Sequence, residues 1–263
     1  MGPIRSRLAR INQKLGARRA AALCPQRVLF LHIPKTAGTT VNAYFKARLG
    51  SSWHGQAVTL TDEASPTLLA LAAKARFIGG HFGARTLRGL GPGLRVTFLR
   101  DPLDRLISAW RFRQSMADPR RRLPFQRLED ALATDHPLVL TLFDNVQARQ
   151  LAIAAEHDAA LPLPRADWLD AALETLSSFA IVGHQESFEA DFRRLLGRLD
   201  LPAPETIARR NVTAAREHRG EALAPLPDRA ILERLAEPFI KIDRALLAAW
   251  DDRQQRERVT IGS

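Results

Sequence analysis

Residues 28–40, VLFLHIPKTAGTT, hold a continuous apolar run followed by a turn that is rich in small and hydroxyl-bearing residues. An apolar run of this length before a proline is typical of a buried parallel strand. From Thr39 onward the apolar side chains recur at helical spacing until Gly50, which predicts a helix over 39–49. A strand that passes directly into a helix favours an α/β fold.

The turn between this strand and this helix has the composition of an anion-binding loop. A helix N-terminus presents unpaired N–H groups and a partial positive charge, so a loop that wraps an anion there needs small residues and a cation. Both are present, together with three hydroxyl groups, in Lys35, Thr36, Ala37, Gly38, Thr39 and Thr40. The alternative interpretation is an ordinary turn in which Thr39 caps the helix.

A second strand-to-helix unit follows at residues 94–114. Its strand is closed by Arg100, whose guanidinium fork suits a phosphate group at the carboxyl end of a parallel strand. Ser108 lies eight residues later, two turns along the predicted helix, where its hydroxyl would reach the same phosphate. The alternatives are an ion pair of Arg100 with a neighbouring aspartate and a surface hydroxyl without a ligand at Ser108.

The remaining pattern indicates one α/β domain. A brief strand at Phe77 and Ile78 breaks into glycines beside His81, and a further strand is predicted at 179–183, followed by a helix. Residues 137–153 have a helical period, and one or two helices are predicted at the C-terminal end. We therefore expect a P-loop-like three-layer fold, a central parallel sheet flanked by helices, over 27–263, with 1–26 as a basic appendage.

Composition narrows the class of protein. The 263-residue chain has a formal net charge of +11, which favours anionic ligands, and its single cysteine excludes an internal disulfide. No apolar run is long enough for a signal peptide or a membrane span, so we expect a cytoplasmic location. Seven cations and no acidic residue lie in 1–27, which predicts a solvated tail or, alternatively, peripheral contact with an anionic membrane.

The motifs HIPKTAGTT and VTFLRDPLDRLISAW together resemble those of a known family. They are similar to the 5′-phosphosulfate loop and the 3′-phosphate element of carbohydrate sulfotransferases that use 3′-phosphoadenosine 5′-phosphosulfate (PAPS), in particular the heparan sulfate and uronyl 2-O-sulfotransferases and their bacterial relatives. The resemblance extends more weakly over most of residues 27–250. It implies that PAPS is the donor, that adenosine 3′,5′-bisphosphate is the product, and that the acceptor is a hydroxyl group of a carbohydrate or a similar molecule.

The resemblance also implies roles for individual residues. Lys35 would stabilise the leaving 5′-phosphate, residues 36–40 would hold the phosphosulfate, and Arg100 and Ser108 would hold the 3′-phosphate. His81 would be the general base, because histidine titrates in the useful range; the alternative is a glutamate, which other sulfotransferases use. The 2-O-sulfotransferases often carry a second histidine two residues earlier, where this chain has Gly79, which removes a paired role. His32, within the first strand, is expected to be structural.

Asn145 and Arg149 lie four residues apart on one predicted helix face, where they would point into an acceptor cleft or form a surface pair. The resemblance also implies that the basic loop at 209–220 would close over the ligands; the alternative is a solvated charged loop. We expect no metal, because no metal-ligand spacing occurs.

Two other classes of protein are weighed against this interpretation. A P-loop kinase or nucleotide hydrolase needs its lysine after the last glycine, whereas Lys35 precedes Gly38. A non-catalytic protein that binds nucleic acid or another polyanion would interleave aromatic and basic residues, and only 6% of this chain is aromatic. We therefore expect no nucleic-acid partner.

Overall fold

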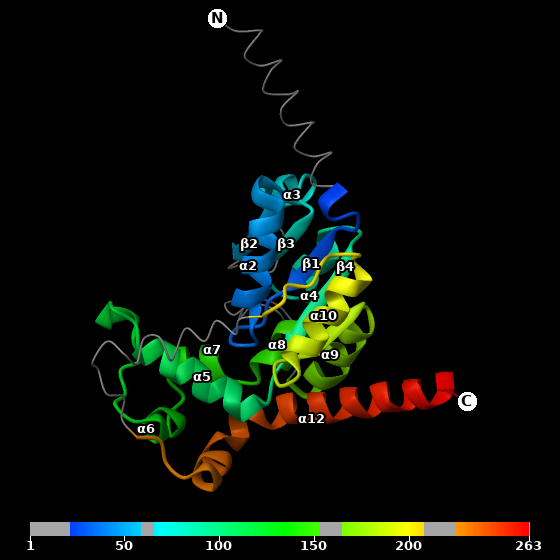
Figure 1. Ribbon diagram of the computed structural model, residues 1–263. Helices are drawn as coiled ribbons and strands as arrows, with labels where there is room; N and C mark the ends of the chain where they lie inside the picture. Colours follow the sequence, from blue (N-terminus) through cyan, green and yellow to red (C-terminus); the bar gives the residue numbers. More distant parts are fainter. Residues whose placement is uncertain (1–21, 59–65, 153–164, 208–224, 263) are drawn as a thin grey trace, which may run out of the picture.

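The computed structural model describes residues 22–58, 66–152, 165–207 and 225–262. Its centre is one five-stranded sheet with the order β2-β3-β1-β4-β5, and every strand pairing in it is parallel. The strands are β1 (Val28–Leu31), β2 (Trp53–Val58), β3 (Phe77–His81), β4 (Leu94–Leu99) and β5 (Ile181–His184). Helices flank this sheet, as the predicted α/β class requires (Figure 1).

The strands are connected and covered by helices of very different length. These are α2 (Gly38–Leu49), α3 (Pro66–Ala72), α4 (Ala84–Gly89), α5 (Pro102–Gln114), α6 (Leu128–Leu132), α7 (Pro137–Phe143), α8 (Val146–Ala152), α9 (Trp168–Ser177), α10 (Phe188–Arg198) and α12 (Arg229–Gly262). Short 3₁₀ turns lie at η1 (Gly50–Ser52), η2 (Pro119–Arg121) and η3 (Arg165–Asp167).

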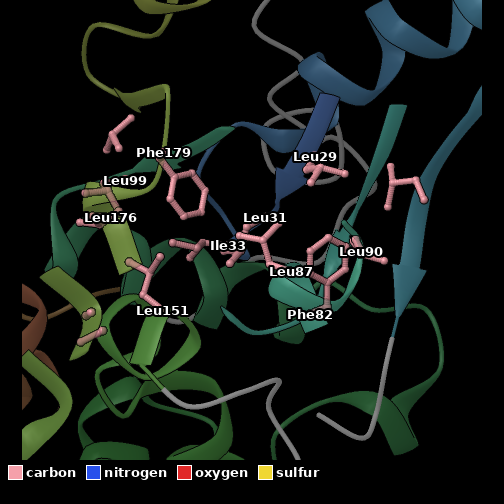
Figure 2. Close-up of a cluster of buried hydrophobic side chains, with 14 of the residues drawn as sticks. Leu29, Leu31, Ile33, Phe82, Leu87, Leu90, Leu99, Leu151, Leu176 and Phe179 are labelled. Atoms are coloured by element: carbon pink, nitrogen blue, oxygen red, sulfur yellow. The ribbon is translucent and has the colours of Figure 1, made fainter. Parts of the chain in front are cut away.

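Side chains of β1 alternate between two hydrophobic cores, as the period of a strand dictates. Val28 and Phe30 face the core that is formed with α2 and α10. Leu29 and Leu31 face the other core, to which α3, α4, α8, α9 and the second half of α12 contribute. Figure 2 shows part of this second core, in which Leu31 and Leu151 lie in the same cluster. Both faces of β1 are therefore buried.

A third core lies beyond the carboxyl ends of the strands. It packs α5, α6 and α7 against the first half of α12. In Figure 1 these helices gather at the end of the sheet toward which the strand arrows point. The ends of β1, β3 and β4 consequently meet a helical layer, and any site at this edge is walled by α5 and the loops.

The structure departs from the sequence predictions at several elements. Strand β2 was not predicted, and the helix predicted at 137–153 is two helices, α7 and α8, which are separated at Asp144 and Asn145. The C-terminal segment forms one helix, α12, with Pro238 inside it. Core contacts begin before the predicted boundary at residue 27, because Cys24 is fully buried. Within the described residues, no helix is long and apolar enough to cross a membrane.

Candidate active site

Three predicted site residues lie at the same edge of the sheet. Lys35 follows β1, His81 ends β3 and Arg100 follows β4, and these three strands are neighbours. The chain goes from β1 to β2 and β3 on one side and later to β4 and β5 on the other, so the strand order switches at β1. Open α/β sheets bind ligands beyond the carboxyl ends of their strands at such a switch point. The fold thus brings together the loop after β1, the candidate base His81 and Arg100, the residue predicted to bind a phosphate.

The loop after β1 has an unusual backbone. Lys35 and Ala37 both have positive φ angles, 74° and 72°, which residues other than glycine rarely adopt. Ala37, not Thr39, is the N-cap of α2; no side chain caps this helix, and its first turn contains no acidic residue. The alternative interpretation of the loop, a turn in which Thr39 caps the helix, is therefore wrong. Uncapped N–H groups and the helix dipole leave this end suited to an anion.

Gly38 is required because the ring of His32 occupies the space beside it. A Cβ atom at Gly38 would lie 2.0 Å from Nε2 and 2.1 Å from Cδ2 of His32. Thr36 is fully buried, and its hydroxyl donates to the carbonyl of Ile33 at 2.8 Å. The hydroxyl of Thr36 is thus engaged within the loop, unlike the ligand-facing hydroxyl that we expected. Thr39 remains exposed.

Lys35 contacts α5 across the loop. Its Nζ atom lies 4.3 Å from the ring centroid of Phe112, a cation–π contact. Ser108 precedes Phe112 by one helical turn, so both lie on the face of α5 that is turned toward the loop. Ser108 is half-buried. Its position is compatible with the phosphate role predicted for it.

Arg100 is hydrogen-bonded to the loop after β1. Its Nη1 donates to the carbonyl of Lys35 at 3.2 Å, while its Nε is buried and has no hydrogen-bond partner among the described residues. Burial lowers the pKa of the Arg100 guanidinium, although nearby carboxylates oppose this effect. A buried guanidinium N–H without a partner is uncommon and is readily explained by an anionic ligand.

The alternative of an ion pair between Arg100 and its neighbouring aspartates is not what the structure contains. Asp104 pairs with Arg229 at 2.7 Å, and Asp101 lies 3.6 Å from the same guanidinium. Asp101 also caps α5 by accepting from the backbone N–H of Asp104 at 2.8 Å. Both carboxylates are therefore engaged elsewhere.

His81 has a defined ring orientation. Its Nδ1 lies 2.8 Å from the backbone carbonyl oxygen of His32, and a carbonyl oxygen only accepts hydrogen bonds. In the neutral ring Nδ1 must then carry the proton, which leaves the lone pair on Nε2. This is the tautomer that a general base at Nε2 needs.

His32 is a second histidine of the site, which the sequence interpretation treated as structural only. Its ring lies 4.4 Å from that of His81, centroid to centroid, and 5.3 Å from that of Phe30. Burial, with smaller effects of His81 and Lys35, holds the pKa of His32 well below its usual range, so this ring stays neutral. The residue two before His81 is Gly79, which has no ring, but His32, directly after β1, places a second imidazole beside His81.

Asn145 and Arg149, the residues predicted to point into an acceptor cleft or to form a surface pair, both make contacts within the protein. Asn145 is fully buried, and its side-chain Oδ1 accepts from the backbone N–H groups of Ile242 and Asp243, at 2.7 and 3.1 Å. Arg149 donates from Nη1 and Nη2 to carbonyls near the end of α7, at 3.1 and 2.6 Å. These contacts hold α8 against α7 and α12, so we assign both residues a structural role.

Two further predictions concern a metal site and the basic segments of the chain. Among the described residues, no group of three or more histidine, cysteine, aspartate and glutamate side chains is arranged to hold a metal ion. The basic loop at 209–220 lies outside the described residues, as does most of the basic segment 1–26.

Comparison with known proteins assigns most of the chain to one family. Residues 24–241 match the family model described as "Sulfotransferase family". This range contains the loop after β1, His81 and Arg100. A search of curated proteins found no match.

Proposed function

Because the chain belongs to the sulfotransferase family, we propose that it transfers a sulfuryl group from PAPS to a hydroxyl group of a carbohydrate acceptor. The observation that carries the donor assignment is the contact between Arg100 and the loop after β1. It joins an uncapped helix end, next to Lys35, to a buried guanidinium with an unsatisfied N–H. Two anion-binding groups at the switch point suit a ligand that bears phosphates at two positions.

The residues present fit such a donor. At the loop, Gly38 has no side chain and its neighbours present backbone N–H groups, so residues 36–40 with Lys35 would hold the 5′-phosphosulfate. Arg100 and Ser108 would hold the 3′-phosphate, since Ser108 shares a helix face with the residue that touches Lys35. A nucleoside triphosphate has no 3′-phosphate for the second position.

The donor supplies an activated sulfuryl group whose bond to a phosphate oxygen breaks as a bond to the acceptor hydroxyl oxygen forms. His81 would take the acceptor proton at Nε2, because Nδ1 is already bonded to the carbonyl of His32. Such general-base catalysis contributes about 10²- to 10⁴-fold to a rate. Lys35 and the start of α2 would stabilise the negative charge that develops on the leaving phosphate.

Transfer of label from ³⁵S-PAPS to a panel of glycans and simpler hydroxyl compounds tests this proposal. We expect a labelled glycan, no turnover in Lys35→Ala, and in His81→Ala a loss of turnover with nearly unchanged affinity for adenosine 3′,5′-bisphosphate. Labelling of no acceptor, together with no binding of the bisphosphate in calorimetry, would refute the proposal. A kinase would instead transfer phosphate from ATP, and a simple polyanion-binding protein would transfer nothing.

A further inference from the structure

Helix α8 carries two buried glutamines, Gln147 and Gln150, next to the candidate site. Gln147 is 0% exposed and Gln150 is 3% exposed, although α8 packs into a hydrophobic core through Ala148 and Leu151. Figure 2 shows Leu151 in this core. Residues three apart on a helix share a face, so both amides point the same way. Buried amides are costly unless they are hydrogen-bonded. Their partners show what they do.

Gln147 clamps the backbone of Arg100. Its Oε1 accepts from the N–H of Arg100 at 2.9 Å, and its Nε2 donates to the carbonyl of Arg100 at 2.8 Å. Arg100 follows the last residue of β4, where the sheet no longer holds the chain. The two bonds thus fix the backbone from which the phosphate-binding guanidinium extends.

Gln150 acts at the other half of the site. Its Nε2 donates to the carbonyl of His32 at 3.2 Å and to the carbonyl of Phe82 at 3.0 Å. The His32 carbonyl is the one that accepts from Nδ1 of His81, and Phe82 follows His81 in the chain. A carbonyl oxygen has two lone pairs, so His81 and Gln150 share this acceptor. Gln150 therefore connects the residue that follows β1, His32, to the residue that follows β3, Phe82. One of the two carbonyls is bonded to the His81 ring, and the other belongs to the next residue in the chain.

Stability alone gives a poor explanation for Gln150. Its Oε1 is buried and has no hydrogen-bond partner among the described residues, an arrangement that lowers stability. An apolar side chain of similar size would avoid this orphan oxygen. The donor side of the amide, which holds the two carbonyls around His81, is what this position requires.

We propose that Gln147 and Gln150 are positioning residues. Through them, α8 fixes the position of the donor-binding Arg100 relative to His81, the general base. Gln147 fixes the backbone of Arg100, and Gln150 fixes the carbonyl that keeps His81 protonated at Nδ1. The proposal rests on the proposed function, in which Arg100 binds the donor and His81 accepts the proton. It predicts that the two glutamines affect different steps.

Gln147→Met and Gln150→Met test the proposal as a matched pair, because both sites are buried on one face of the same helix. For Gln147→Met we expect weaker binding of adenosine 3′,5′-bisphosphate, by about tenfold or more, with the His81 ring unchanged. For Gln150→Met we expect bisphosphate affinity within about twofold of wild type and a fall in kcat of about 10²-fold, the cost of a misplaced catalytic group. General damage to folding would instead move both properties in both variants, and that outcome would overturn the proposal.

The tautomer of His81 supplies a readout that needs neither donor nor turnover. In ¹⁵N-labelled protein, long-range ¹H–¹⁵N spectra report which ring nitrogen carries the proton, and the spectrum of His81→Asn identifies the His81 signals. We expect the Nδ1–H form in wild type and in Gln147→Met, and a mixture of both tautomers in Gln150→Met. An Nε2–H form in wild type would overturn the proposal even if no variant folded. If the tautomers behave as expected but no sulfuryl transfer occurs, the positioning role stands and the proposed function fails.

Discussion

At the residue scale, Gly38 in the loop after β1 has no room for a side chain. Alanine there would place Cβ 2.0 Å from the His32 ring, so the ring or the loop must move. Overpacking of this kind costs about 1–3 kcal/mol in the free energy of unfolding. We predict that Gly38→Ala loses binding of adenosine 3′,5′-bisphosphate in calorimetry by more than its loss of stability explains.

Gly197 provides the control for this substitution. It lies within α10, and a Cβ atom there would meet no atom within 4 Å. Alanine in a helix is about 0.5–1 kcal/mol better than glycine, so Gly197→Ala should be slightly more stable and bind the bisphosphate like wild type. Unchanged binding in Gly38→Ala would show that the loop after β1 is not the anion site.

The sequence predicted three candidate site residues that the structure places at one edge of the sheet. Lys35 and Arg100 directly follow apolar strands, and His81 stands where a strand breaks into glycines. His32 and Phe112 were missed as functional residues, because their contacts are made across elements that are far apart in sequence. The signal for the glutamines of α8 was stronger, since two amides three residues apart interrupt an apolar helix face.

At the scale of the element, Asn145 bonds to the backbone of α12 between Pro238 and Asp243. In an unbroken helix, the N–H groups of Ile242 and Asp243 bond to the carbonyls of Pro238 and Phe239. Here Asn145 engages all four groups: its Oδ1 accepts from the two N–H groups, its Nδ2 donates to the carbonyl of Pro238 and its backbone N–H donates to that of Phe239. Insertion of a side chain into a helix next to a proline is a known origin of a kink.

Asn145→Ala should consequently lower the free energy of unfolding by about 3 kcal/mol or more, because two buried N–H groups lose their acceptor. Asn145 also has a φ of 43°, so Asn145→Gly should be about 1 kcal/mol less harmful than Asn145→Ala. Urea unfolding measures both values. A stable Asn145→Ala variant with a raised KM for the acceptor would contradict the structural role and restore the acceptor role.

Asp243 gives the junction between α8 and α12 a pH dependence. Its buried carboxylate accepts from the backbone N–H groups of Gln147 and Ala148, at 3.2 and 2.7 Å. Burial raises the pKa of Asp243 from 3.8 to about 6, although Arg105, the two hydrogen bonds and Arg149 oppose the shift. The folded state therefore binds this proton more tightly than the unfolded state does.

The sign of the effect follows from that difference. Between about pH 4 and pH 6 the folded state carries more protons, so the contribution of Asp243 to stability falls as the pH rises, by about 3 kcal/mol in total. Asp243→Asn does not titrate. Urea unfolding from pH 4 to pH 7 should show the stability of wild type decreasing relative to Asp243→Asn across this window. Parallel curves would contradict the shifted pKa.

The separation of α7 from α8 shows why element boundaries were less predictable than element types. The helical period runs through residues 137–153 without an obvious break. The break at Asn145 is set by its contacts with α12, almost a hundred residues later. Local pattern carries no information about such a partner. Strand β2 was missed for a related reason, because it lies at the edge of the sheet and its polar sequence follows no buried-strand pattern.

At the scale of the whole molecule, the order of the strands makes the site. The sequence predicted a parallel sheet, but no local pattern states that β1 lies between β3 and β4. That order places the loop after β1 between His81 and Arg100. In the proposed function, this puts the base on one side of the donor-binding loop and the second phosphate contact on the other. The family match over residues 24–241 extends across all of these elements.

In the proposed function, this edge of the sheet recognises a nucleotide with phosphates at both the 3′ and 5′ positions. Calorimetric titration of wild type and Arg100→Lys with adenosine 3′,5′-bisphosphate and with adenosine 5′-monophosphate tests it most directly. We predict that wild type binds the bisphosphate at least about tenfold more tightly, as expected for a charge-assisted contact, and that Arg100→Lys loses most of this preference. Equal affinity of wild type for the two nucleotides, or an undiminished preference in Arg100→Lys, would contradict the account.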